Sequence, residues 1–219
     1  MKKLFKENTL VLSVYFAFFL VGVVLVFSYS KADLHLIINQ WHTAFFDVFF
    51  KYATHLGGGG MVVVLFLIFL LIKTRYAVVF ISGNVVIAIV VQGMKHIIFP
   101  HALRPVAYFK GIHVLHLVQG VSMHSYNSFP SGHSAAAFGL FMMLISITKN
   151  KALKFLWLLI ALLTAYSRIY LSQHFMEDIV TGSIIGVTGM FLTVYYFNRY
   201  HPDLYNYSIL DRLSNKHKA

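Results

Sequence analysis

Long stretches without a single charged residue limit what this chain can fold into more than any other feature. Each of the four longest could cross about 30 Å of hydrocarbon as a helix. They cover residues 9–28, 52–72, 76–94 and 179–197. Of the 219 residues, 58% are hydrophobic and only 11% are charged, a composition far from that of soluble domains. The sequence therefore predicts one membrane-embedded domain over residues 1–219 rather than a soluble protein.

Two shorter apolar stretches, 131–148 and 155–167, bring the expected number of spans to six. The second reaches spanning length only if its helix continues through Arg168 toward His174. An arginine at the end of a span is expensive to keep there and indicates function. The first stretch, 9–28, resembles a signal-peptide core, but its length and the lack of a small-residue cleavage site favour a retained helix.

The distribution of basic residues predicts the direction of the spans, because Lys and Arg are retained on the cytoplasmic side. In a six-span arrangement 12 of the 18 basic residues share one side. These are Lys2, Lys3, Lys6, Lys73, Arg75, Lys149, Lys151, Lys154, Arg199, Arg212, Lys216 and Lys218. The other six are Lys31, Lys51, Lys95, Arg104, Lys110 and Arg168. Both termini are therefore expected in the cytoplasm, with a tail over about 198–219.

The segment between the first two spans carries apolar residues at helical spacing. These are Leu34, Ile37, Ile38, Trp41, Phe45, Val48 and Phe49. Because polar positions such as Asn39 and Asp47 lie between them, we expect an amphipathic helix in the outer interface. The glycine run 57–60 predicts a bend before the second span, since no GK[ST] follows that would make it a phosphate loop. The expected fold is an all-α polytopic membrane protein with six transmembrane helices and this interfacial helix.

Composition excludes several classes of function. The formal net charge is +11, but the basic residues punctuate apolar runs instead of gathering on one solvated face, so no nucleic-acid partner is expected. The chain has no cysteine, which excludes disulfides, thiolate metal sites and cysteine nucleophiles.

The motif Phe129-Pro130-Ser131-Gly132-His133-Ser134 directly precedes the fourth span. A Pro-Ser pair at this place predicts a helix N-terminus. First-turn amides have no partner within the helix and bind anions, and a glycine lets an anion come close to the backbone. Ser131 and Gly132 are therefore candidates for phosphate binding, although an ordinary N-cap beside a chance histidine has the same pattern.

A second motif runs from Ser167 to Asp178. His174 and Asp178 are four residues apart, which on a continuous helix puts them on one face within hydrogen-bond reach. A carboxylate there orients the imidazole, and an oriented imidazole is a good nucleophile toward phosphorus. Arg168 offers a planar fork of donors for phosphoryl oxygens, though a snorkelling arginine at a helix end is the simpler alternative.

These residues resemble the three-part signature of the type 2 phosphatidic acid phosphatase family: Lys with Arg-Pro, then Pro-Ser-Gly-His, then Ser-Arg with a following His and Asp. The second part matches at residues 130–133. The third matches with five residues between Arg168 and His174 and three between His174 and Asp178. The resemblance covers a catalytic core of about 76–197, and the six-helix topology fits it as well.

The first part departs from the family pattern. Eight residues separate Lys95 from Arg104-Pro105, where the family usually has six. Arg104 is assigned to the phosphate site by the resemblance. Lys95 reaches the site if a bulge near Pro100 absorbs the two extra residues. Otherwise Lys110 or His101 takes its place, and Lys95 is an interfacial anchor.

The resemblance also implies a mechanism. His174 attacks phosphorus to form a phosphohistidine, Asp178 orients it, and His133 protonates the leaving oxygen and then activates water. Lys95, Arg104, Arg168 and the amides near Ser131 and Gly132 stabilise the equatorial oxygens, the usual division of labour in phosphoryl transfer. The mechanism requires neither a metal nor another cofactor.

Two rival interpretations remain. A catalytic metal has candidate ligands in His96, His101, His113, His116 and His124, but no helical His pair with an intervening Glu supports it. A lipid transporter or non-catalytic lipid-binding protein would place its polar groups near the middle of the membrane, whereas here they lie at span ends.

The partners expected are the bilayer and a lipid substrate reached from the outer leaflet of a bacterial inner membrane. Four substrates are candidates: lipid A phosphate, undecaprenyl pyrophosphate, phosphatidylglycerol phosphate and phosphatidic acid. The first two are favoured.

Overall fold

The computed structural model describes residues 2–203, and side chains from residue 4 onward. This part of the chain is helical and contains no strand. In chain order the elements are α1 (Lys2–Ser28), α2 (Lys31–Asn39), α3 (Ala44–Ala53), the 3-10 turn η1 (Thr54–Gly57), α4 (Gly59–Ile72), α5 (Thr74–Gly93), the π-helical turn η2 (Met94–Ile98), α6 (Pro105–Tyr108), α7 (Gly132–Ile147), α8 (Lys151–Tyr170) and α9 (Met176–Tyr200).

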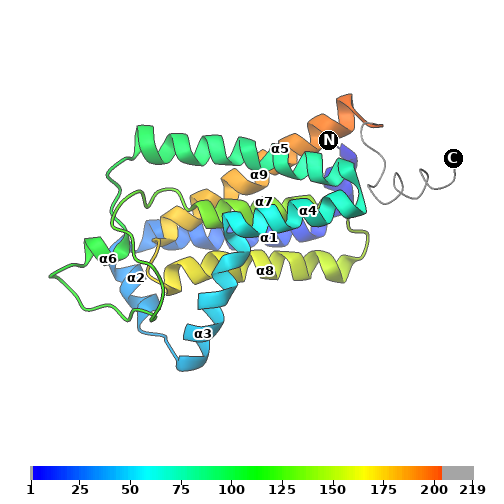
Figure 1. Ribbon diagram of the computed structural model, residues 1–219. Coiled ribbons are helices and arrows are strands. Elements are labelled where there is room, and N and C mark those ends of the chain that lie inside the picture. Colours follow the sequence, from blue (N-terminus) through cyan, green and yellow to red (C-terminus); the bar gives the residue numbers. More distant parts are fainter. Residues whose placement is uncertain (1, 204–219) are drawn as a thin grey trace.

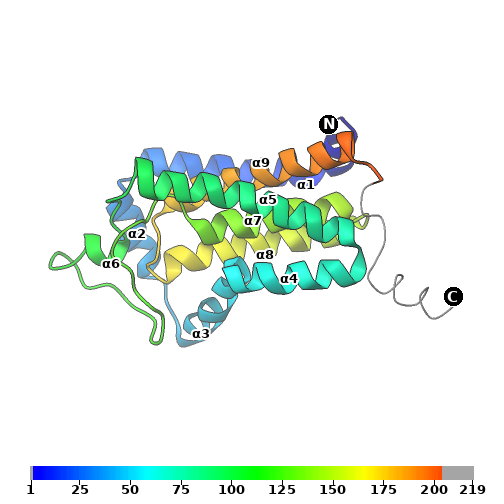
Figure 2. The same ribbon diagram turned by 45° about the horizontal axis from the view of Figure 1, so that its top comes forward.

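Six long helices lie side by side in one bundle, with α7 at its centre (Figures 1 and 2). α7 contacts α1, α5, α8, α9 and η1. Its side chains Ala135, Phe141, Met142 and Met143 are at most 1% exposed. A helix that is apolar on all sides is expected to be buried, and α7 fills this place.

The number of membrane spans in the structure agrees only in part with the six predicted from the sequence. Within residues 2–203, four helices are long and apolar enough to cross a membrane: α1, α5 with η2, α8 and α9. A fifth span results if α3 with η1 and α4 are counted as one, although they are bent by 58°. α7 has only 16 residues and falls in the class of shorter apolar helices. The six-span count therefore stays a prediction.

The stretch 52–72, expected to supply one span, is not one continuous helix. The chain breaks at Gly58, an extended residue between η1 and the 14-residue α4. A Cβ at Gly57 would lie 2.5 Å from the carbonyl oxygen of His133. Only glycine permits this approach, so the predicted bend exists and brings η1 against the first turn of α7.

Other boundaries also differ from the prediction. α8 begins at Lys151 rather than at 155, because Lys154 is buried and its Nζ donates to Asn8 Oδ1 at 2.6 Å. α9 continues to Tyr200, so the predicted tail over 198–219 begins inside a helix. The rest of that tail, 204–219, lies outside the described residues.

The predicted interfacial helix is two helices. α2 ends at Asn39, and α3 begins after Thr43, whose hydroxyl accepts a hydrogen bond from Phe46 N at 3.2 Å. Helical spacing alone does not reveal this N-cap. α3 crosses the bundle at a steep angle in Figure 1. Its Phe50 is buried against α8, whereas Phe45 is 71% exposed.

The crossing of α7 and α9 positions the functional residues most directly. A Cβ at Gly186 would lie 2.2 Å from Ala135 O, and one at Gly182 would lie 2.5 Å from Ser131 O. Small residues four apart allow such close helix packing. As a result, the start of α7 lies against the start of α9.

The two ends of the bundle carry different parts of the chain. The described chain begins and ends at one of them (Figure 1). The other end carries the loop from η2 to α7 and the turn between α8 and α9 (Figures 1 and 2). The predicted functional residues gather at this second end.

Candidate active site

The predicted helix start at Ser131 is confirmed. Ser131 is the N-cap of α7, and its hydroxyl accepts hydrogen bonds from Ser134 N at 3.3 Å and Ser134 Oγ at 2.9 Å. Its amide donates to Asp178 O at 2.9 Å. Ser131 is fully buried and its own amide is paired, so the amides near it that the prediction assigns to phosphate are not its own. Any backbone contribution must come from Gly132 and His133.

His133 is the second residue of α7. Its side chain is partly buried and has no hydrogen-bond partner among the residues that the structure describes. A Cβ at Gly58 would lie 3.8 Å from its Nε2, so the imidazole lies beside the break between η1 and α4. Because no described residue bonds to the His133 ring, its imidazole is available to a substrate.

His174 and Asp178 are in contact, but not on one continuous helix as the spacing had suggested. α8 ends at Tyr170 and α9 begins at Met176, so His174 lies in the turn between them. His174 Nδ1 is 3.1 Å from Asp178 Oδ2. The same oxygen accepts hydrogen bonds from Phe175 N at 2.9 Å and from the Ser128 hydroxyl. The carboxylate caps α9 and orients the ring at once.

This contact determines the chemistry of the imidazole. With Nδ1–H donating to the carboxylate, Nε2 carries the free lone pair, the tautomer that a nucleophile needs. Burial, together with the charges of Arg168, Arg104 and Lys95, lowers the pKa of His174 well below its usual value of 6.5. The ring is therefore neutral at physiological pH.

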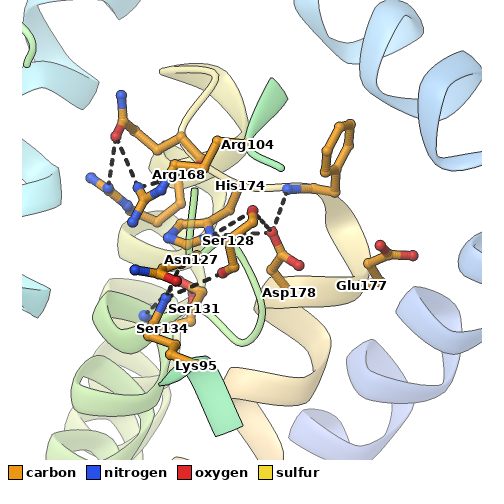
Figure 3. Close-up of polar contacts among 12 residues, drawn as sticks. Lys95, Arg104, Asn127, Ser128, Ser131, Ser134, Arg168, His174, Glu177 and Asp178 are labelled. Carbon is orange, nitrogen blue, oxygen red and sulfur yellow. Dashed lines mark hydrogen bonds and ion pairs between the residues drawn. The ribbon is translucent and has the colours of Figure 1, made fainter. Parts of the chain in front are cut away.

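Two arginines face His174 from different elements (Figure 3). Arg168, near the end of α8, donates from Nη1 to Thr54 Oγ1 of η1 at 2.5 Å. Its Nε is buried and has no partner in the described part of the chain. An unsatisfied buried donor is costly, and a phosphoryl oxygen would satisfy it.

Arg104 approaches from the loop before α6. Its Nε donates to Tyr126 O at 3.0 Å, and its Nη1 lies 3.2 Å from Gln173 Oε1. Burial lowers the pKa of Arg104, and the charge of Asp178 partly offsets this effect. Two guanidinium groups at one buried place form a strong anion site.

Lys95 lies in the π-turn η2 and is buried. Its ammonium donates to the carbonyls of Asn127 and Ser128, the second at 3.3 Å. The extra residues before Arg104 are thus accommodated by a wider helical turn and the loop after it, as the predicted bulge required. The alternatives Lys110 and His101 are exposed.

The chain is similar to proteins that are already known. Residues 76–202 match the PAP2 superfamily. The chain belongs to this superfamily. The match confirms the family resemblance that the motifs had indicated.

Three known proteins are similar to the chain. The lipid A 4'-phosphatase of Bacteroides thetaiotaomicron is 41% identical over 69 residues, which cover 32% of this chain and 30% of that protein. The crystal structure of Aquifex aeolicus LpxE is 26% identical with a TM-score of 0.67, covering 75% of this chain and 94% of that one.

A transmembrane PAP2-type phosphatidylglycerolphosphate phosphatase from Bacillus subtilis is 19% identical with a TM-score of 0.59, covering 90% and 98% of the two chains. At this identity the likeness concerns the fold alone. The apolar helices of the described residues and the PAP2 match support a membrane-embedded chain.

Three residues in contact with the PAP2 motifs were missed by the sequence analysis: Thr54, Ser128 and Gln173. Ser128 and Gln173 each lie within three residues of a motif position. This short distance in the sequence could have indicated that they contact the motif residues. Thr54 comes from η1, far away in sequence, and nothing local indicates its contact with Arg168.

The loop histidines considered as metal ligands do not gather around the PAP2 site. Within the described residues no group of three His, Asp or Glu side chains is arranged to hold a metal ion. His116 Nε2 is instead 3.0 Å from Asp47 Oδ1, and its ring stacks on His42 at 3.7 Å.

Proposed function

We propose that this chain is a metal-independent lipid phosphatase that removes a phosphate from lipid A through a phosphohistidine on His174. The observation that carries the proposal is the oriented, neutral imidazole of His174 beside two guanidinium groups, one of which has a buried Nε without a partner. PAP2 membership and the apolar bundle support a phosphorylated lipid as substrate.

The reaction has two steps. His174 Nε2 attacks phosphorus, the bond from phosphorus to the lipid oxygen breaks, and His133 gives its proton to that oxygen. His133 then takes a proton from water, the resulting hydroxide attacks phosphorus, and the bond to Nε2 breaks to release inorganic phosphate. Arg104, Arg168 and Lys95 stabilise the charge on the transferred group.

The topology belongs to the same proposal. Counting α3 with η1 and α4 as one bent span and α7 as another gives six spans, with α2 and the start of α3 in the outer interface. Both termini are then cytoplasmic in a bacterial inner membrane, and the catalytic end of the bundle faces outward. A lipid in the outer leaflet presents its phosphate at this depth.

Lipid A is preferred over the other candidates because a protein that is 41% identical over 69 residues is a lipid A 4'-phosphatase. Undecaprenyl pyrophosphate is the second candidate, since the same two arginines also suit a terminal phosphate of a diphosphate. Phosphatidylglycerol phosphate has support only from a fold likeness at 19% identity.

The test is release of inorganic phosphate by the purified chain from equal amounts of the four candidate lipids in mixed micelles, with and without EDTA. We expect fastest release from lipid A and no effect of EDTA. His174→Ala should be inactive, and His113→Ala, an exposed loop histidine, serves as the matched control. Phosphate release that EDTA abolishes, or none from any lipid, would refute the proposal.

A further inference from the structure

The side-chain amide of Gln173 lies between the two arginines of the site. Its Oε1 is 3.2 Å from Arg104 Nη1 and 3.5 Å from Arg168 Nη2. The residue is 2% exposed and directly precedes His174. Gln173 is thus the one described side chain whose acceptor both guanidinium groups share.

The opposite end of the amide determines its orientation. Nε2 lies 3.3 Å from Ser122 O, 3.0 Å from Met123 Sδ and 3.5 Å from Leu171 O. All three are acceptors, and the arginines are donors only. A flipped amide would place donors against donors on one side and acceptors against acceptors on the other, so the oxygen must face the arginines.

The amide oxygen compensates for an unfavourable arrangement. Two guanidinium groups brought together in a buried place repel each other, more strongly than they would in water. A shared neutral acceptor reduces that repulsion and fixes the planes of both groups without neutralising them. A carboxylate at the same place would form ion pairs with both arginines and compete with a phosphate.

We propose that Gln173 is a positioning residue that holds Arg104 and Arg168 in one orientation for the phosphoryl group. This inference rests on the proposed function. In detail, the bridging oxygen leaves Arg168 Nε and Arg104 Nη2 for phosphate oxygens, because Arg104 Nη1 bonds to Gln173. The link from Nε2 to Ser122 O ties both arginines to the loop before α7.

The test compares Gln173→Met, which keeps the volume and removes the acceptor, with Gln173→Glu, which adds a charge. Orthovanadate binding is measured by calorimetry on the full chain in detergent, and KM and kcat are measured separately. For Gln173→Met we expect about tenfold weaker vanadate binding and a raised KM with a smaller change in kcat, from loss of hydrogen bonds to charged groups.

Gln173→Glu gives a readout that a merely structural role would not move. Two guanidinium groups beside the new carboxyl keep it ionised, so the binding deficit of this variant relative to the parent should be larger than that of Gln173→Met at every pH at which the chain stays folded. Gln119→Met, on an exposed loop position, is the matched control and should bind vanadate like the parent.

The outcomes separate the inference from the proposed function. If the vanadate affinity of Gln173→Met is within twofold of that of the parent, Gln173 does not position the two arginines. This conclusion would hold even if the parent hydrolyses lipid A. A parent that binds vanadate but hydrolyses no lipid would refute the proposed function. The vanadate affinities of the variants relative to the parent would still test the role of Gln173. If gel filtration shows Gln173→Met misfolded, vanadate binding by Gln173→Glu within twofold of the parent overturns the inference.

Discussion

At the scale of single residues, three donors converge on one oxygen of Asp178: Ser128 Oγ, Phe175 N and His174 Nδ1. Such a carboxylate cannot rotate away without losing several hydrogen bonds at once. The His174 ring is therefore held through Nδ1, which leaves Nε2 for the proposed attack on phosphorus.

Lys95 provides a test at this scale, because its spacing from Arg104 is irregular. Its ammonium is buried and directed at the loop that carries Ser128. We expect Lys95→Ala to lower kcat/KM by about ten- to a thousandfold, the effect of a charge-assisted donor lost from a dry site. Lys110→Ala, an exposed lysine of the same loop, is the control. Activity of Lys95→Ala within twofold of the parent would remove Lys95 from the site.

Gly132 provides a second test. A Cβ there would meet only Val91 Cγ1 at 3.7 Å, an ordinary contact. The fold does not require glycine at this position, but close approach of a phosphate to the first-turn amides does. We expect Gly132→Ala to unfold like the parent in a thermal melt and to lose at least about tenfold in kcat/KM. Unchanged activity would show that the amides of Gly132 and His133 do not bind the substrate.

Much of the residue-scale account was predictable from spacing. Arg168, His174 and Asp178 were assigned from a pattern within one segment, and Ser131 from a helix-start signal. The pairing of the Ser131 amide with Asp178 O, on another helix, was not indicated by the sequence. Thr54 was missed for the same reason: contacts between distant segments depend on helix packing, which local spacing does not encode.

At the scale of elements, the crossing of α7 and α9 determines the geometry of the site. Helix backbones can approach this closely only where glycine replaces a side chain. Gly182 lies opposite Ser131 O and Gly186 opposite Ala135 O. The glycines therefore bring the N-cap of α7 to Asp178 on α9.

Gly186→Ala tests this role. Its Cβ would lie 2.2 Å from Ala135 O and 2.9 Å from Gly139 N, and backbone atoms cannot move aside as a side chain can. We expect destabilisation by about 1–3 kcal/mol, as for overpacked cores, measured by denaturant unfolding in detergent. Gly93→Ala, with nothing within 4 Å of the new Cβ, is the matched control. Equal stabilities of the two variants would contradict the proposed packing.

Element boundaries were less predictable than element types. Hydropathy found every long helix, but it does not register a break inside an apolar run, so the bend within 52–72 was predicted from its glycines alone. The break at Gly58 depends on the approach of η1 to α7. The π-turn at Lys95 likewise has no signal in apolar periodicity, because it changes the direction of a side chain and not its polarity.

At the scale of the whole molecule, the described chain begins and ends at one end of the bundle, and the site lies at the other (Figures 1 and 2). The sequence predicted this separation from the 12 to 6 division of basic residues. The same division predicts which end is cytoplasmic.

Cysteine labelling tests the orientation of the chain in the membrane, because the chain has no cysteine of its own. We expect Ser125→Cys, in the exposed loop at the catalytic end, to react with a membrane-impermeant maleimide in intact cells. Asn150→Cys, between α7 and α8 at the opposite end, should react only after the cells are permeabilised. The reverse pattern would overturn the orientation and the choice of leaflet.

The central claim is that His174 carries the phosphoryl group and that His133 transfers protons. These roles predict different behaviour toward leaving groups: an alkyl oxygen needs protonation, whereas a nitrophenolate needs little. The substrates are therefore a lipid phosphate and a nitrophenyl phosphate, both labelled in the phosphoryl group.

Rapid-quench trapping of phosphoenzyme in His174→Ala and His133→Ala, each checked for folding by gel filtration, tests the claim most directly. The account predicts that His174→Ala forms no phosphoenzyme with either substrate, while His133→Ala accumulates phosphoenzyme with nitrophenyl phosphate and reacts poorly with the lipid. Phosphoenzyme in His174→Ala, with none in His133→Ala from either substrate, would contradict it.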